Sequence, residues 1–255
     1  MSMQDPDFDP RRFWQECLAA GFDLNTTGHP GLSAAYNERC YRLRRFVLDE
    51  VLARHRVPVA GHEVLDAGCG TGFFVQHFLE RGAHLSGVDL TDVSVERLSA
   101  RFPQAHFEVG NLATWRPPHT YDLVSCFDVL FHIVDDDAWD SAMTNLTDAV
   151  KPGGWFVFTE HYFRKPPTFQ AVHNRSRGRA AYATALIARG LAVMDERPTQ
   201  HLMNRELGPF RFLNRFPELI YRVDLALLMT RLFEGNGENR LVLARRPIVG
   251  EPHPA

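Results

Sequence analysis

The chain has 255 residues, of which 45% are hydrophobic and 23% are charged, a balance that is ordinary for a globular protein with a buried core. Its formal net charge of −3 argues against a dedicated nucleic-acid-binding protein, whose binding domain is usually clearly basic. The four cysteines have no spacing typical of a disulfide framework or a metal site. We therefore predict reduced thiols, no metal ion and a cytoplasmic location.

No segment has the pattern of a targeting signal or a membrane span. Residues 1–6 contain an acid and a proline, unlike the apolar core of a signal peptide. The most apolar late stretch, 219–233, contains Arg222, Asp224 and Arg231 and is too short to cross a bilayer. We therefore expect neither a signal peptide nor a membrane partner.

Residues 8–60 predict helices. Asp9 and Pro10 fit a helix N-cap followed by proline at the first helical position, and Gly21 marks the end of that helix. From Tyr36 to Val51, apolar residues recur at steps of three and four, the spacing of one helix face. We therefore expect helices ahead of the first strand.

Residues 63–160 alternate between apolar strands and helical segments. The predicted strands cover 64–65, 84–89, 105–109, 121–127 and 155–160. The predicted helices between them cover 73–81, 92–100 and 138–150. Such alternation favours βαβ units and a mostly parallel sheet with right-handed crossovers.

The last third of the chain is less regular. We predict a helix over 175–189, a strand over 191–196 and a final strand over 241–244. Residues 201–237 form a predicted insertion with one apolar helix, 219–233, stopped by glycines at 235 and 237. That helix is expected to be a packed lid or the surface of a homodimer.

The most informative motif is a glycine-rich loop after the first strand. The strand ends in Asp66, and glycines follow at every second position, at Gly68, Gly70 and Gly72. Glycine adopts positive φ angles and, having no Cβ, lets the backbone approach a ligand closely. Dinucleotide-binding loops have the spacing G-x-G-x-x-G, whereas this chain has D-x-G-x-G-x-G. The loop resembles motif I of class I S-adenosylmethionine (SAM)-dependent methyltransferases.

Further motifs follow in the order found in this family. Asp89 ends the second strand, where a carboxylate can accept hydrogen bonds from both ribose hydroxyls of SAM. Residues 110–112 follow the third strand, where the family places a residue for the adenine amine. Residues 121–132 resemble motif IV, and 151–154 resemble the signature before strand five. The resemblance spans roughly residues 60–160.

The resemblance implies a fold and a cofactor. The fold would be α/β, with a doubly wound, Rossmann-like, mostly parallel seven-stranded sheet whose last strand is antiparallel. Residues 1–60 would be a helical cap over the cofactor and 61–255 the SAM-binding domain, with 201–237 as a helical insertion before the last strand. The cofactor would be SAM, and its product S-adenosylhomocysteine.

The same resemblance implies a set of cofactor-binding residues. They are Tyr36, Asp66, Gly68, Gly70, Gly72, Asp89, Leu90, Asn111, Leu112 and Phe127. In methyltransferases whose N-terminal helices close over the cofactor, residues in this region reach the methionine carboxylate. Tyr41 and Arg45 could join Tyr36 in that contact.

Motif IV narrows the substrate. Enzymes that methylate nucleobase or amide nitrogens carry N/D-P-P-Y/F there and cytosine-C5 enzymes carry Pro-Cys, whereas residues 125–128 read Ser-Cys-Phe-Asp. We therefore expect methyl transfer to O, N or C of a small molecule such as a specialised metabolite, with no nucleic-acid partner. The alternatives are a protein or peptide methyltransferase, a non-catalytic SAM-binding protein and an NAD-linked oxidoreductase.

Candidate catalytic residues lie after the fourth and fifth strands. His132 and His161 could act as a general base near neutral pH, which is needed only when the acceptor must lose a proton. Glu160 is a weaker candidate for the base, and Asp128 is expected to position its loop.

A basic cluster of Arg175, Arg177 and Arg179 lies near His173 in the sequence. It is either the solvated start of a helix or a site for an anionic group of the acceptor. The second alternative follows because the planar Arg fork binds carboxylate and phosphate groups.

Overall fold

The computed structural model describes residues 8–29, 31–162, 168–203, 208–231, 239–248 and 250. Within this part of the chain, the main sheet has seven strands in the order β3-β2-β1-β4-β5-β9-β8. Their bounds are β1 (Glu63–Ala67), β2 (His84–Asp89), β3 (His106–Val109), β4 (Tyr121–Cys126), β5 (Val150–His161), β8 (Ala192–Pro198) and β9 (Asn239–Arg245). Strands β1 to β5 pair in parallel, and β9 is antiparallel to both β5 and β8. The predicted fold class, including the antiparallel last strand, is confirmed.

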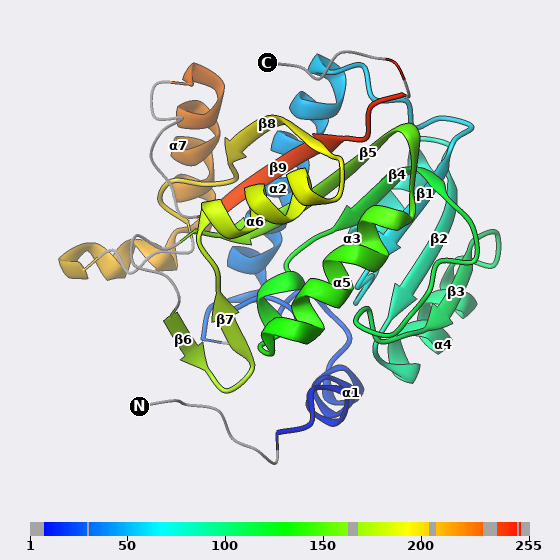
Figure 1. The fold of residues 1–255 in the computed structure, drawn as a ribbon. Coiled ribbons are helices and arrows are strands. Elements are labelled where there is room, and N and C mark those ends of the chain that lie inside the picture. The colour runs from blue at the N-terminus through cyan, green and yellow to red at the C-terminus, as the bar shows by residue number, and fades with distance from the viewer. Residues whose placement is uncertain are drawn as a thin grey trace.

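Helices cover both faces of this sheet (Figure 1). Their bounds are α2 (Ala34–Arg54), α3 (Phe73–Glu80), α4 (Asp92–Arg101), α5 (Asp136–Asp148), α6 (Arg179–Ala188) and α7 (Pro217–Thr230). Successive residues of β1 face opposite cores: Val64 packs on the side of α2 and α3, and Leu65 on the side of α5 and α6. A strand buried on both faces needs apolar residues at consecutive positions, which is why these strands are continuous apolar runs.

Helix α1 (Pro10–Ala20) lies apart from these layers, at the end of the sheet where the parallel strands finish (Figure 1). It begins as the sequence predicts, because the Asp9 side chain accepts hydrogen bonds from the backbone of Arg11 and Arg12 and proline takes the first helical position. Arg11 also pairs with Asp92 at 3.0 Å, which ties α1 to the first turn of α4.

The segment after β5 differs from the prediction. Strands β6 (Thr168–Ala171) and β7 (Asn174–Ser176) form an antiparallel hairpin, and α6 begins only at Arg179. The predicted helix over 175–189 is therefore wrong at its start. The physical reason is that residues 174–176 pair with β6 as a strand, and Gly178, with an extended backbone, separates them from the helix.

The late insertion contains the short helix η2 (Gly208–Arg215) and α7, which packs against α2. The predicted stop of the apolar helix at 235–237 lies outside the described residues. None of the described helices is long and apolar enough to cross a membrane. No group of three His, Cys, Asp or Glu side chains in the described part is arranged to hold a metal ion.

Candidate active site

A cavity of about 260 Å³ lies where β1 to β4 end, with α1 along its rim. This is the place where open parallel sheets bind their ligands. The predicted site residues that line it are Asp66, Gly68, Gly70, Asp89, Leu90, Asn111, Leu112, Phe127 and His132. Tyr36, Gly72 and His161 are not among its lining residues.

The three glycines of the loop serve different purposes. All have positive φ angles, from +49° to +80°. A Cβ on Gly68 would lie 2.3 Å from Val129 Cγ2, and one on Gly72 would lie 2.4 Å from Leu98 Cδ2, so both are required by packing. A Cβ on Gly70 would meet nothing closer than 3.8 Å, because this residue opens into the cavity. Gly70 therefore leaves space for a ligand, whereas its two neighbours let helices and strands pack.

Asp89 joins the end of β2 to this loop. Its Oδ2 accepts a hydrogen bond from Gly70 N at 2.9 Å. Its Oδ1 accepts from Thr91 N at 3.0 Å and from Thr91 Oγ1 at 2.8 Å. Burial raises the pKa of Asp89, and these hydrogen bonds oppose the rise. Asp89 also lines the cavity, so its carboxylate lies where a ligand could donate to it.

Asp66 is a buried carboxylate on the cavity wall. Ser125 Oγ donates to its Oδ1 at 2.8 Å, and burial raises the pKa of Asp66 to about 7. The described residues that line the cavity include no Lys or Arg, while four aspartates line it. A cavity with several carboxylates and no cation favours a positively charged ligand, which would balance their charge.

The adenine side of the predicted site is apolar. Leu90 and Leu112 both line the cavity. The Asn111 side chain is exposed and accepts a hydrogen bond from Ala113 N at 3.0 Å, as in an Asx turn. Phe127 and Phe74 also line the cavity, and their rings meet at a tilt of 32° with centroids 4.0 Å apart.

Asp128 is held by an ion pair that sequence reasoning missed. Its φ angle is +58°, in the left-handed region. Arg44 Nε of α2 lies 3.2 Å from its Oδ2, and Thr159 Oγ1 donates to Oδ1 at 2.9 Å. Burial alone would raise the pKa of Asp128, but the charge of Arg44 and these contacts bring it below its usual value. The missed signal is a charged residue on the buried stripe of α2, between Cys40 and Val47.

His132 is the histidine that reaches the cavity. Its Nδ1 lies 2.8 Å from the backbone oxygen of His173, and its ring meets the Trp14 indole edge to face at 4.8 Å. Because a carbonyl only accepts hydrogen bonds, the proton is on Nδ1 and Nε2 is an acceptor. Burial lowers the pKa of His132 to about 4, so the ring is neutral at pH 7.

The other predicted base candidates lie behind the cavity wall. His161 packs edge to face against Phe131 at 4.8 Å, and burial lowers the pKa of His161 to about 4. Glu160 accepts a hydrogen bond from Tyr182 Oη, and burial raises the pKa of Glu160 to about 8. Neither side chain lines the cavity.

Of the three N-terminal residues that the sequence predicts near the cofactor, Tyr41 lines the cavity, whereas Tyr36 and Arg45 are not among its lining residues. Tyr36 is fully buried in the core, whereas Tyr41 lines the cavity and donates to Thr27 Oγ1 at 2.9 Å. From α1, Trp14 and Leu18 line the cavity together with Pro10. Their spacing of four residues is a helix stripe, and this signal could have identified α1 as part of the site.

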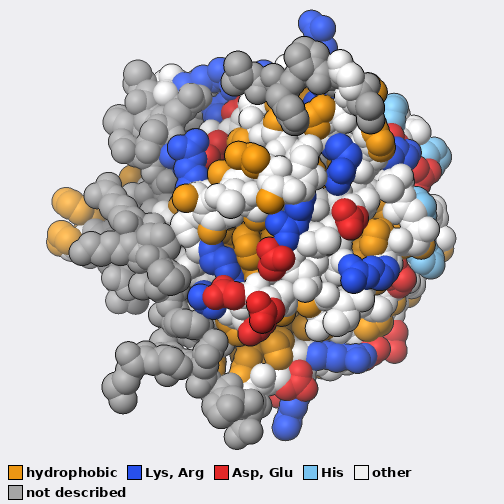
Figure 2. Space-filling model, in the orientation of Figure 1, with side chains coloured by type: hydrophobic (Ala, Val, Ile, Leu, Met, Phe, Trp, Pro, Cys, Tyr) orange, Lys and Arg blue, Asp and Glu red, His pale blue; other side chains and the backbone are white. Residues whose placement is uncertain are grey.

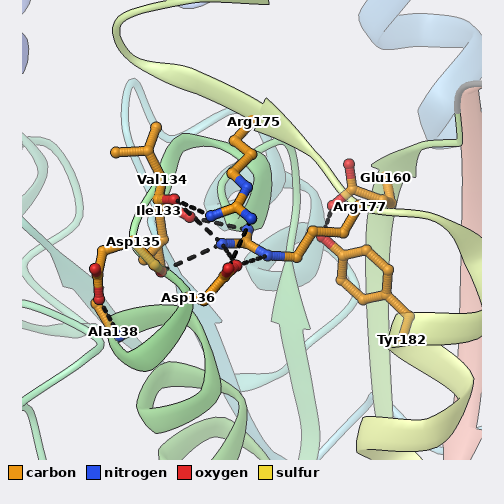
Figure 3. A network of polar contacts seen from close by, with 9 residues as sticks. All are labelled: Ile133, Val134, Asp135, Asp136, Ala138, Glu160, Arg175, Arg177 and Tyr182. Atoms are coloured by element: carbon orange, nitrogen blue, oxygen red, sulfur yellow. Dashed lines mark hydrogen bonds and ion pairs between the residues drawn. The ribbon is translucent and has the colours of Figure 1, made fainter. Parts of the chain in front are cut away.

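The three arginines of the basic cluster have partners within the chain. Arg175 and Arg177 both bind Asp136 and backbone oxygens of 133–135, as Figure 3 shows. Arg179 pairs with Glu196 at 2.6 Å. The prediction of an anion site at this cluster gains no support from this arrangement.

Comparison with known proteins gives a family match at this site. Residues 64–154 match the family model described as a methyltransferase domain. Those residues are a methyltransferase domain. They include the glycine loop, Asp89 and His132, and with the fold they confirm the predicted class I, Rossmann-like methyltransferase family and its cofactor SAM.

Two curated relatives match part of this chain. The ubiquinone biosynthesis O-methyltransferase of Albidiferax ferrireducens is 35% identical over 123 residues, which are 45% of this chain and 47% of the relative. The protein of the same name from Nitrosospira multiformis is 33% identical over 111 residues, covering 40% of this chain and 44% of the relative. The chain therefore matches less than half the length of each relative.

Solved structures share the fold over most of the chain. Magnesium protoporphyrin IX methyltransferase from Synechocystis, with bound SAM, has a TM-score of 0.62 at 17% identity and covers 95% of this chain and 100% of its own. The N-methyltransferase NodS from Bradyrhizobium japonicum, with bound S-adenosylhomocysteine, has a TM-score of 0.61 at 16% identity over 94% and 100%. At this identity the likeness shows the fold alone.

Proposed function

We propose that this chain transfers the methyl group of SAM to a small molecule, with a hydroxyl oxygen as the acceptor atom to test first. The observation that carries the proposal is the single cavity in which Gly70 opens to a ligand, Asp66 and Asp89 supply carboxylates and His132 supplies a neutral imidazole. The methyltransferase match supports the activity, and the names of the curated relatives support oxygen as acceptor.

The residues present fit SAM. Asp89 Oδ2 would accept from a ribose hydroxyl, and Leu90 and Leu112 would enclose the adenine. Gly68 and Gly70 would lie along the methionine part of SAM. There the Asp66 carboxylate would balance the positive charge of the cofactor. The unfilled space at Gly70 and the unbalanced buried carboxylate of Asp66 are the features that such a ligand completes.

The reaction asks little of the protein beyond alignment and proton transfer. SAM supplies a methyl group on a positively charged sulfur, which leaves as a neutral thioether. The chain aligns the acceptor atom with that methyl group and excludes water, and orientation can supply up to about 7–11 kcal/mol. With SAM and a hydroxyl acceptor bound, Nε2 of His132 would accept the proton that the hydroxyl loses on methylation.

The proposed acceptor is small and carries no anionic group. The described cavity has no Lys or Arg on its wall to bind a carboxylate or phosphate. Trp14, Ile133 and Val134 give the wall an apolar character instead. The proposed cap of residues 1–60 restricts entry through α1, which favours a small molecule over a folded protein. A homodimer and a cytoplasmic location stay predictions.

Calorimetric titration with SAM, S-adenosylhomocysteine and NADH tests the cofactor. We expect affinities of about 1–100 μM for the two sulfur compounds and no binding of NADH, in line with ordinary enzyme–substrate affinities. Binding of NADH alone would overturn the proposal. Transfer of label from methyl-labelled SAM to neutral small molecules of a cell extract then tests catalysis, and a binding protein without turnover would show none.

A further inference from the structure

The β6–β7 hairpin presents three residues to the segment that follows His132. They are His173 in the turn, Arg175 in β7 and Arg177 just after β7. All three contact residues 132–136, the link between η1 (Leu130–His132) and α5. A segment that lines the cavity is thus held by the β6–β7 hairpin, more than 40 residues later in the chain.

Arg177 makes most of these contacts. Its side chain is only 5% exposed, and its planar guanidinium has five N–H donors in a fixed arrangement. Nη1 donates to Ile133 O at 2.9 Å, and Nη2 donates to Asp135 O at 3.2 Å and to Asp136 Oδ1 at 2.9 Å. The same group lies 4.8 Å from the ring of Trp139. Three fixed directions therefore pin the backbone between His132 and α5 (Figure 3).

Arg175, which lies in β7, adds a second set of contacts to the same loop. Its Nη1 donates to Val134 O at 3.0 Å, and its Nη2 pairs with Asp136 Oδ2 at 2.6 Å. Asp136 thus receives both arginines, one on each carboxylate oxygen. The loop and the hairpin form one rigid unit because each is fixed at several points.

The carbonyl of His173 is part of that unit. It accepts the hydrogen bond from His132 Nδ1, and the two imidazole rings stack with centroids 5.6 Å apart. Which nitrogen of a neutral histidine carries the proton is decided by the partner of the other nitrogen. The position of this one carbonyl therefore decides whether Nε2 is a donor or an acceptor toward the cavity.

We propose that the β6–β7 hairpin is a positioning element for His132: Arg177, assisted by Arg175, fixes the His173 carbonyl against Nδ1, so that Nε2 faces the cavity as an acceptor. This inference rests on the proposed methyl transfer for its chemical use, since Nε2 then receives the acceptor proton. Arg177 touches neither cofactor nor acceptor and acts only through the loop.

Long-range ¹⁵N–¹H NMR of the histidine side chains tests the inference without an acceptor, because it reports which imidazole nitrogen is protonated. The His132 signals are assigned from their loss in His132→Gln. At pH 7 we expect His132 in the Nδ1–H form in about tenfold excess, as one additional hydrogen bond would give. A predominant Nε2–H form in the unmodified protein would overturn the proposal.

Substitutions then separate positioning from general stability. Arg177→Gln should yield a mixture of both His132 tautomers. Arg177→Lys keeps the positive charge but loses the planar guanidinium with its several N–H donors, so it should restore the Nδ1–H excess only in part. Arg179→Gln is the matched control, because Arg179 is exposed and pairs with Glu196. His173→Ala should keep the Nδ1–H form, because the backbone carbonyl is retained.

Two further outcomes decide the proposal. A folded Arg177→Gln protein, or an Arg177→Lys protein if the first does not fold, with the tautomer ratio of the unmodified protein would contradict the role of Arg177. The calorimetric SAM titration is independent of this result. Failure to bind SAM would count against methyl transfer, while the tautomer of His132 alone decides the role of the hairpin.

Discussion

The two halves of the cavity are held in place by different kinds of contact. The cofactor half, meaning the glycine loop with Asp66 and Asp89, depends largely on hydrogen bonds between residues close in the sequence: Asp89 reaches Gly70 over 19 residues and Thr91 over two, although Asp66 accepts from Ser125 Oγ, 59 residues away. The acceptor half, meaning Asp128 and residues 132–135, is held by distant side chains and a distant carbonyl. His132 binds a carbonyl 41 residues away, and Arg177 binds one 44 residues away.

This difference separates what each half does. A loop fixed by its own backbone gives one geometry that suits one cofactor, because few side chains take part in setting it. The wall of the acceptor half is fixed by long-range ion pairs and by the β6–β7 hairpin. It can therefore change when the sequence of that hairpin changes. We therefore expect substitutions in the cofactor half to alter SAM binding more than stability, and those in the acceptor half to do the reverse.

The largest effect should come from Arg44→Met in the acceptor half. It leaves the Asp128 carboxylate buried without its partner, and breaking a buried pair in this way costs about 3–5 kcal/mol. Denaturant unfolding followed by circular dichroism measures the loss. Adding Asp128→Asn should recover part of it, because Asn removes the charge and tolerates the positive φ angle. A loss below about 1 kcal/mol would contradict a role for this pair in holding the acceptor half.

Asp89→Ala should have the next largest effect, a loss of SAM binding, together with some loss of stability because Gly70 N and Thr91 lose their acceptor. Loss of a charge-assisted hydrogen bond to the ribose, worth about 1.5–3 kcal/mol, lowers affinity about 10–100-fold. Calorimetry measures the affinity, and thermal unfolding checks that the fold is kept. Glu96→Ala on the exposed side of α4 is the matched control for charge. Unchanged SAM affinity in Asp89→Ala would remove Asp89 from the cofactor half.

The same contrast explains what the sequence could predict. The strands β1 to β5, the glycine loop and the end of β2 follow from local patterns, namely apolar runs, glycine spacing and an acid at a strand end, while the seven-stranded sheet with its antiparallel last strand was implied by the family resemblance. The Arg44–Asp128 pair and the contacts of Arg177 involve residues far apart in the chain, so no local pattern contains them. Arg175 to Arg177 were predicted as helix because a short strand of polar side chains carries little hydrophobic signal.

Asp66 should make SAM binding depend on pH. Its pKa in the empty protein is about 7, so below pH 7 a proton must leave before the carboxylate can balance a cationic ligand. Affinity should therefore fall by about tenfold for each unit below pH 7 and level off above it. Calorimetry in two buffers of different ionisation enthalpy should detect proton release at pH 6. Asp66→Asn should abolish this release, and a pH-independent affinity in the unmodified protein would contradict the assignment.

The prediction with the smallest expected effect tests whether α1 links the cofactor half of the cavity to the acceptor half. Arg11 of α1 pairs with Asp92 beside the cofactor half, while Trp14 of the same helix packs on His132 in the acceptor half. The Arg11 and Asp92 side chains are 54% and 49% exposed, and such pairs contribute about 0.2–1 kcal/mol. Arg11→Gln should therefore speed SAM dissociation only about 2–5-fold, and less at high salt because salt screens exposed charges. Arg12→Gln is the control, because Arg12 pairs with Glu16 within α1 and bridges nothing. Equal dissociation rates for the two variants in stopped-flow measurements would mean that α1 covers the acceptor half without holding the cofactor.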